Sequence, residues 1–176
     1  MAALHPVRGM LGRLTFRSSS LEDGGVSSTI RYESRTTIDR PVEEVFARLA
    51  DLPAYSTWMH RSGLFRWCRQ ISDGPIEVGT TYLDATRMGT YRGEVTEFER
   101  PSRIGFRERL RWFGSASAEA RPEYSLEADR ETTIVHHVAE GELFGWMRVM
   151  KPAAALMARS ERARTLKSLR RSLESN

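Results

Sequence analysis

Six short segments in which apolar and polar residues alternate, followed by one long helical segment, constrain the fold of this chain most. The alternating segments cover residues 65–72, 80–88, 91–98, 103–112, 117–128 and 132–140. Turn-forming residues such as Asp73-Gly74-Pro75 and Arg100-Pro101-Ser102 separate them. Connections this short join antiparallel strands, because a parallel pair needs a long crossover. The pattern therefore predicts an antiparallel meander.

After Gly145 the spacing of the apolar residues lengthens to that of a helix. Residues 153–173 contain neither glycine nor proline. An apolar stripe is formed there by Leu156, Ala163, Leu166, Leu169 and Leu173. We expect one amphipathic helix of roughly 20 residues, about 30 Å long.

A further strand and two short helices precede the meander. Residues 26–38 predict the strand, with Ile30, Tyr32 and Ile38 on one face. Asp39 before Pro41 predicts a helix start with Asp39 as the capping carboxylate. The buried stripe of this helix is expected to consist of Val42, Val45, Phe46 and Leu49. A second short helix is expected over residues 54–60.

This order of elements predicts an α+β fold in which a seven-stranded curved antiparallel sheet wraps around the C-terminal helix. A sheet of seven strands is too twisted to lie flat, and only the terminal helix is long enough to cover its concave face. Two curved surfaces of different radius leave space between them, so we expect an internal cavity for a small molecule. At 176 residues the chain suits one domain, over residues 28–176, with a flexible extension over residues 1–27.

Composition argues against several other classes. The single cysteine, Cys68, excludes an intramolecular disulfide, and the four histidines lack metal-ligand spacing. No apolar run approaches the roughly 20 residues of a membrane span. We expect no cofactor, no metal and a cytoplasmic location. The net charge of +4 is concentrated in residues 159–176, which predicts one basic helix face with Arg162, Arg170 and Arg171 and no specific nucleic-acid partner.

Strand alternation suggests a polar patch inside the cavity. Glu108 shares a face with apolar residues while arginines occupy the other face of its strand, and Asp84 shares a face with Tyr82. The same reasoning places His136 inward and His137 outward. We hypothesise that His136, Glu108 and Asp84 move protons on a bound carbonyl compound, as aldol-type cyclisation or dehydration requires. The alternative is that they only orient a ligand.

Large apolar side chains are the candidate ligand contacts. The candidates are Trp58, Tyr82, Met88, Tyr91, Phe106, Trp112, Tyr124, Trp146 and Met150. The alternative for each ring is ordinary core packing, because aromatic residues dominate core burial.

Several motifs in order resemble one superfamily. They are residues 38–46 (IDRPVEEVF), Asp51-Leu52-Pro53 through Trp58, Gly79-Thr80 with Tyr82, residues 95–98 (VTEF) and residues 101–106 (PSRIGF). Over residues 28–175 the sequence resembles the helix-grip superfamily of START domains, birch-pollen allergens and polyketide cyclase/dehydrase-like proteins. The resemblance implies the helix-grip fold and a ligand cavity. The superfamily includes cyclases, hydrolases, hormone receptors, chaperone cofactors and carriers of quinones and lipids, so the resemblance leaves the activity open.

Three functions remain at this point. The first is binding of a small hydrophobic or aromatic ligand, such as a polyketide, quinone or lipid, in the cavity. The second is a cofactor-independent cyclase or dehydratase that uses the same cavity. The third is an interaction protein that docks the basic face of its C-terminal helix onto an acidic partner, RNA or an anionic membrane. The sequence does not determine the oligomeric state.

Overall fold

The computed structural model describes residues 29–60, 65–86, 89–112 and 115–175, so the expected extension over residues 1–27 lies outside it. The strands are β1 (Thr29–Ile38), β2 (Phe65–Arg69), β3 (Thr81–Thr86), β4 (Gly89–Glu99), β5 (Arg103–Trp112), β6 (Ser115–Asp129) and β7 (Thr132–Leu143). The helices are α1 (Val42–Ala50), η1 (Leu52–Ala54), α2 (Tyr55–Trp58), η2 (Gly145–Met150) and α3 (Lys151–Glu174).

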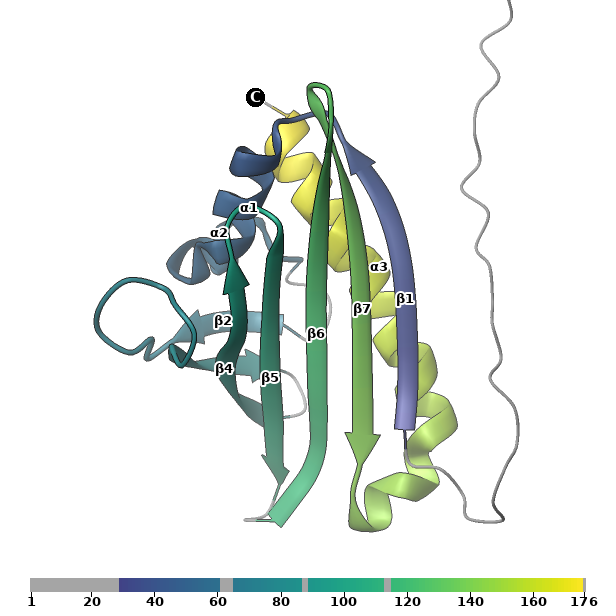
Figure 1. Cartoon of the computed structure of the whole chain (residues 1–176). Helices are drawn as coiled ribbons and strands as arrows, with labels where there is room; N and C mark the ends of the chain where they lie inside the picture. Colours follow the sequence, from purple (N-terminus) through teal and green to yellow (C-terminus); the bar gives the residue numbers. More distant parts are fainter. Residues whose placement is uncertain (1–28, 61–64, 87–88, 113–114, 176) are drawn as a thin grey trace, which may run out of the picture.

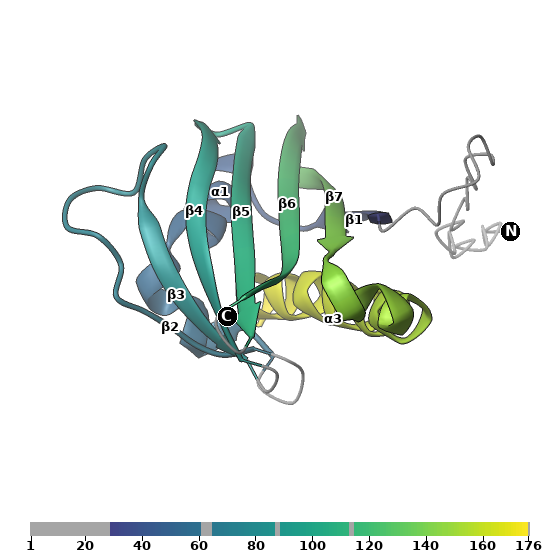
Figure 2. The same cartoon turned by 90° about the horizontal axis from the view of Figure 1, so that it is seen from below.

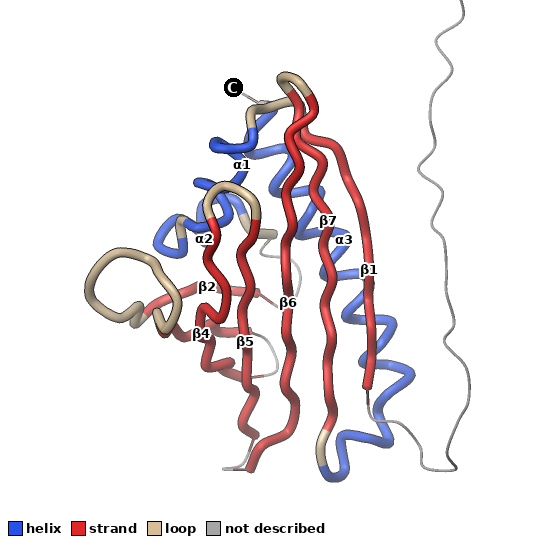
Figure 3. The backbone as a smooth tube through the Cα atoms, in the orientation of Figure 1, coloured by secondary structure: helices blue, strands red, loops and turns tan. Residues whose placement is uncertain are grey.

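All seven strands form one antiparallel sheet in the order β1-β7-β6-β5-β4-β3-β2. Strands β2 to β6 each pair with the next strand in sequence, whereas β1 pairs with β7 at the other edge of the meander. The sheet is curved, and α3 runs along its concave face (Figures 1 and 2). Figure 3 shows α1 and α2 beside the C-terminal half of α3. The predicted α+β helix-grip fold is confirmed.

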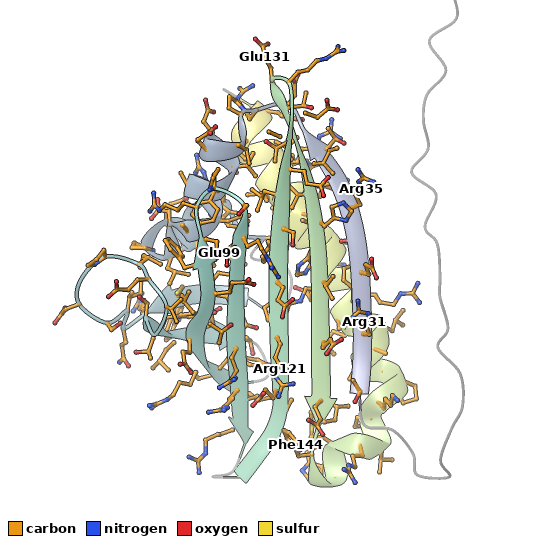
Figure 4. The ribbon with its side chains drawn as sticks, viewed as in Figure 1. Arg31, Arg35, Glu99, Arg121, Glu131 and Phe144 are labelled. Carbon is orange, nitrogen blue, oxygen red and sulfur yellow. The ribbon has the colours of Figure 1, made fainter. Side chains whose placement is uncertain are left out.

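The inner and outer faces of β3 and β5 follow the predicted alternation. Tyr82 and Asp84 face inward on β3 and are buried. Ile104 and Phe106 are buried on β5, and Glu108 lies on the same face. The convex face carries charged pairs instead, such as Arg109 with Glu119 at 2.8 Å. In Figure 4, Arg31, Arg35 and Arg121 point away from α3 on this face.

The predicted facing of β7 is wrong, because His137 is fully buried and His136 is only partly covered. The buried residues on this strand are Thr133, Val135, His137, Ala139 and Leu143. The two faces of β7 carry similar numbers of apolar residues, so alternation alone could not decide between them. The pairing of β7 with its neighbouring strands determines which face is buried, since His137 lies opposite Ser34 of β1 and Tyr124 of β6.

The α1 helix begins two residues later than the capping prediction implies. Pro41 occupies the N-cap position and no side chain caps the helix, so the predicted role of Asp39 is wrong. The backbone N–H of Asp39 instead donates to Glu174 at 3.0 Å, which ties the start of α1 to the end of α3. The predicted stripe is confirmed for Val45, Phe46 and Leu49, which are at most 1% exposed.

The α3 helix has the expected length but only part of the expected stripe. Leu166, Leu169 and Leu173 are buried as predicted, whereas Leu156 is 71% exposed and Ala163 is exposed. The prediction fails in the first half of the helix because its inward positions are not leucines. They are occupied by Ala154, Met157, Ala158, Glu161, Arg162 and Thr165.

Candidate functional site

A cavity of about 210 Å³ lies between the sheet and the N-terminal half of α3. Its existence follows from side-chain size. The inner faces of β6 and β7 carry Ala118, Ala120, Ala139 and Gly141 at this level, and α3 faces them with Ala154 and Ala158. Small residues on both surfaces cannot bridge the distance between a helix and a curved sheet, so a void remains.

One side of the cavity is apolar and adaptable. Tyr32 of β1 and Leu143 of β7 line it together with Met59, Met147 and Met157, which come from three separate segments. Unbranched thioether side chains adjust to ligands of different shape more readily than branched aliphatic ones. These residues therefore suit an apolar ligand and tolerate variation in its shape.

The polar part of the lining includes Asp84, Glu108, Tyr91 and Arg162. An Arg162 Nη2 atom lies 3.5 Å from Glu108 Oε2, and both side chains are less than one-fifth exposed. The Tyr82 hydroxyl donates to Glu108 Oε1 at 3.4 Å. The Glu108 carboxylate thus has two partners, one from α3 and one from β3, and its orientation toward the cavity is defined.

Gly93 makes this arrangement sterically possible. It lies on β4 between Tyr82 of β3 and Glu108 of β5, with which it is paired in register. A Cβ atom at Gly93 would lie 2.1 Å from the Tyr82 ring. The tyrosine therefore crosses β4 over the glycine and reaches the carboxylate two strands away.

Asp84 is the buried acid of the site. Burial, and after it the neighbouring Glu108 charge, raise its pKa to about 8, although Cys68 and Arg162 act in the opposite direction. Its Oδ1 atom is buried and has no hydrogen-bond partner. A carboxyl group with this pKa is largely protonated at neutral pH, so Asp84 presents an uncharged donor-acceptor group at the cavity wall.

Cys68 and the neighbouring tyrosines are inert at neutral pH. Burial raises the pKa of the Cys68 thiol, and the adjacent Asp84 raises it again. Burial also raises the pKa of Tyr91 and of Tyr124 to about 12. These phenols remain protonated, and the Tyr124 hydroxyl is hydrogen-bonded to the Arg162 guanidinium. The polar wall therefore carries fixed hydrogen-bonding groups and the ion pair of Arg162 with Glu108.

His137 lies behind the polar wall and stays neutral. Its ring stacks on Tyr124 with 4.2 Å between centroids, and burial lowers its pKa to about 3. Its Nδ1 lies 3.0 Å from the carbonyl oxygen of Glu123. Because that oxygen can only accept, Nδ1 carries the proton and Nε2 is a buried acceptor without a partner.

The structure brings only some of the predicted site residues to the cavity. Asp84, Glu108 and Tyr91 line it. Tyr82, Phe106, Tyr124 and Trp58 are buried in the core cluster, where Tyr82 and Tyr124 reach the polar wall only through Glu108 and Arg162. Trp146 and Met150 are exposed, at 59% and 46%, and His136 lies on the outer face. Met88 and the side chain of Trp112 lie outside the described residues.

The predicted position of Arg162 on a solvated basic face with Arg170 and Arg171 is wrong. Arg162 faces the cavity and pairs with Glu108. Arg170 pairs with Glu174 at 2.8 Å, so the three arginines do not form one free face. The available signal is helical spacing, since Ala154, Ala158 and Arg162 lie on the same side of α3 as the three buried leucines.

Within the described part of the chain, no group of three His, Cys, Asp or Glu side chains is placed to hold a metal ion. None of the helices described here is both long and apolar enough to cross a membrane.

Residues 29–174 match the family described as "Polyketide cyclase / dehydrase and lipid transport". No curated protein matches the sequence. A START superfamily protein from Mycobacterium smegmatis is similar in structure, with a TM-score of 0.66 and 12% identity over 82% of this chain and 97% of that one. The di-domain ARO/CYC BexL from the BE-7585A biosynthetic pathway has a TM-score of 0.67 and 11% identity, over 87% of this chain and 52% of that one. Ara h 8.0201 has a TM-score of 0.65 and 11% identity, over 84% of this chain and 99% of that one. At these identities the likeness shows the fold alone.

Proposed function

Because the chain belongs to the polyketide cyclase / dehydrase and lipid transport family, we propose that it binds a compact apolar or aromatic molecule carrying a hydrogen-bonding oxygen. The observation that carries this proposal is the cavity of about 210 Å³, apolar on one side, with the unpartnered carboxyl oxygen of Asp84 in its polar wall. An unpaired buried polar atom is costly, so a ligand that pairs with it gains affinity.

The volume favours a small ring system over a long acyl chain. Cavities that hold drug-sized ligands measure roughly 300–1,000 Å³, and a dry cavity of about 150 Å³ accommodates benzene. A cavity of about 210 Å³ therefore suits one or two fused rings. The methionines that line it allow the outline of the ligand to vary around this size.

The charges of the polar wall favour a neutral ligand. The Arg162 guanidinium is balanced by the Glu108 carboxylate, so an anionic ligand would compete with Glu108 for the same cation. Asp84 is largely protonated at neutral pH because its pKa is raised to about 8. Its carboxyl group can donate to a carbonyl or hydroxyl oxygen of the ligand, which fixes the orientation of the ring.

The test is a pair of substitutions on one helix. Ala158→Leu places a larger side chain in the cavity, whereas Ala163→Leu makes the same change on the exposed side of α3. With 2-naphthol as a two-ring phenolic probe, we expect Ala158→Leu to weaken binding at least about tenfold, because the extra carbons occupy the ligand space. Binding is followed by fluorescence titration of the full chain.

Ala163→Leu is expected to bind 2-naphthol as the wild type does. Equal affinities for the wild type and Ala158→Leu, or no binding to the wild type, would contradict a ligand site in this cavity. Native mass spectrometry of gently purified protein gives an independent readout, since a bound natural ligand adds its mass to the wild type and not to Ala158→Leu.

A second candidate function is a cofactor-independent cyclase or dehydratase that uses the same cavity. The observation that favours it is the proximity of a protonated acid, Asp84 of β3, to a carboxylate, Glu108 of β5, across the intervening strand β4. Such a pair supplies an acid and a base on one side of a bound carbonyl compound. His136, which lies on the outer face, has no part in this version of the hypothesis. Catalysis requires the Asp84 proton to transfer to the substrate, whereas binding requires only that it be shared.

A further inference from the structure

The outer side of η2 and of the first turns of α3 is apolar and basic, and we call it the η2–α3 surface. Its exposed members are Trp146, Arg148, Val149, Met150, Pro152, Ala153, Leu156 and Arg159. The described residues include five large hydrophobic side chains that are strongly exposed, and four of them lie here: Trp146 at 59%, Val149 at 82%, Met150 at 46% and Leu156 at 71%. Exposed apolar side chains gathered in this way mark an interaction site.

The charge of this surface is positive throughout. Residues 143–160 contain Arg148, Lys151 and Arg159 and no acidic residue. Two carboxylates on the neighbouring strands pair with arginines of the sheet, Glu140 with Arg31 and Glu119 with Arg109 and Arg121. A partner for the η2–α3 surface must therefore combine apolar contact with negative charge.

This charge argues against two occupants supplied by the protein itself. A second copy would bring the same cations face to face if the contact were symmetric. Residues 1–28 carry three arginines against Glu22 and Asp23, so this segment has a net positive charge as well. Neither complements a surface of this sign.

We propose that the η2–α3 surface docks onto an anionic lipid bilayer. Tryptophan prefers the boundary between headgroups and hydrocarbon, and apolar side chains flanked by lysine and arginine are typical of segments that lie in that boundary. Anionic headgroups attract the three cations, while Val149, Met150 and Leu156 enter the apolar layer. Figure 1 shows η2 and the start of α3 at one end of the molecule, beyond the ends of β1 and β7, where a planar surface can reach them.

The inward side of the same segment lines the cavity through Met147, Ala154, Met157 and Ala158. A helix with its side chains is about 10–12 Å across, so docking would hold the cavity within about that distance of the bilayer. The docking proposal stands on the exposed residues and does not depend on the ligand. If the proposed ligand binding also holds, the lipid phase is the source or destination of the ligand.

The experiment is co-sedimentation of the full chain with vesicles, at about 0.1 M and about 1 M salt. One set of vesicles contains phosphatidylcholine alone, and the other contains phosphatidylcholine mixed with phosphatidylglycerol. We expect binding to the mixed vesicles at the lower salt concentration, and much weaker binding to phosphatidylcholine alone or at the higher salt concentration. The double variant Val149→Asp/Leu156→Asp should bind at least about tenfold more weakly, because it places carboxylates at the apolar contact.

Val78→Asp is the matched control, since Val78 is 60% exposed but lies in the segment between β2 and β3. It should bind vesicles as the wild type does. The double variant should keep its circular dichroism spectrum and its affinity for 2-naphthol, which separates failure of docking from failure of the cavity. Equal vesicle binding by the wild type and the double variant overturns the proposal. So does sedimentation velocity that shows a wild-type dimer and a monomeric double variant, because the surface would then join two copies.

Discussion

The two halves of α3 lie against the same sheet but contact it in opposite ways. In the C-terminal half, Leu166, Leu169 and Leu173 are at most 6% exposed, and they pack in the core with Ile38 and Val135, which are fully buried. In the N-terminal half, none of residues 151–165 is buried. There the helix faces alanines and a glycine across the cavity. We call these the packed half and the hollow half of α3.

Side-chain size on both surfaces produces this difference. Where β1, β7 and α1 offer Ile38, Val135 and Phe46, the leucines of α3 find close contacts and water is excluded. Where β6 and β7 offer alanine and glycine, space remains and Arg162 can enter it with Glu108 as its partner. The packed half therefore stabilises the fold, and the hollow half is available for a ligand.

Truncation of one residue in each half tests this division and should give the largest effect. We expect Leu169→Ala to lower the free energy of unfolding by about 4 kcal/mol, because it removes a fully buried side chain and leaves a cavity. Met157→Ala enlarges a cavity that already exists and should cost less than about 1 kcal/mol. Urea unfolding followed by tryptophan fluorescence measures both. Similar losses for the two variants would mean that α3 is anchored evenly along its length.

Asp84 allows a test of the hollow half by pH. Its pKa is about 8 in the folded chain and about 3.9 in an unfolded one, so the folded state binds more protons between these values. The free energy of unfolding therefore falls as pH rises from about 4 to about 8, by about 1.4 kcal/mol per pH unit. Between pH 5 and pH 7 the wild type should lose about 3 kcal/mol relative to Asp84→Asn, which does not titrate.

Urea titrations of both proteins at the two pH values give this difference. Asp73→Asn, in an exposed turn, is the control and should follow the wild type. If the wild type and Asp84→Asn respond to pH in the same way, Asp84 is not held protonated in the fold. The polar wall would then carry a second negative charge, which a neutral ligand could not balance.

The fold was predictable from the sequence because its signals are local. Turns at Arg100-Pro101-Ser102 and Asp129-Arg130-Glu131 mark where strands end, because their residue types form turns in any context. The turn at Asp73-Gly74-Pro75 separates β2 from β3, although β2 ends earlier than predicted, at Arg69. The predicted bounds of β5 coincide with the observed Arg103–Trp112, and those of β7 differ only at the end of the strand. Alternation then assigned the inner face wherever the two faces differ clearly in polarity, as on β5.

The site was less predictable because its residues are selected by contacts between distant segments. Glu108 and Asp84 stand out as acids among apolar neighbours, and helical spacing places Arg162 on the side of the buried leucines, but neither signal shows that Arg162 meets Glu108 across a cavity. The reversal of His136 and His137 has a similar cause, since the partners of β7 determine which side faces α3. Leu156 is exposed because the first turns of α3 face the cavity with Ala154 and Ala158, which leaves the leucine on the outer side of the helix.

The smallest of these effects comes from the ion pair of Arg162 with Glu108 in the hollow half. A double-mutant cycle with Arg162→Met and Glu108→Gln measures the coupling of the two side chains through the free energy of unfolding. We expect about 2 kcal/mol, because both groups are less than one-fifth exposed and removal of either leaves a charge poorly solvated. Glu108 also lies beside Asp84, so loss of Arg162 removes the cation that moderates repulsion between the two acids.

The pair Arg40–Glu44 supplies the comparison from the other end of the molecule. It joins residues one helical turn apart at the start of α1, with 3.7 Å between the charged atoms, and Glu44 is 56% exposed. The cycle of Arg40→Met and Glu44→Gln should give about 0.4 kcal/mol, because water screens the pair. Equal couplings in the two cycles would place Arg162 in solvent rather than inside the cavity. A larger coupling for Arg162 and Glu108 would show that the hollow half is held open by charge where the packed half is held by leucine side chains.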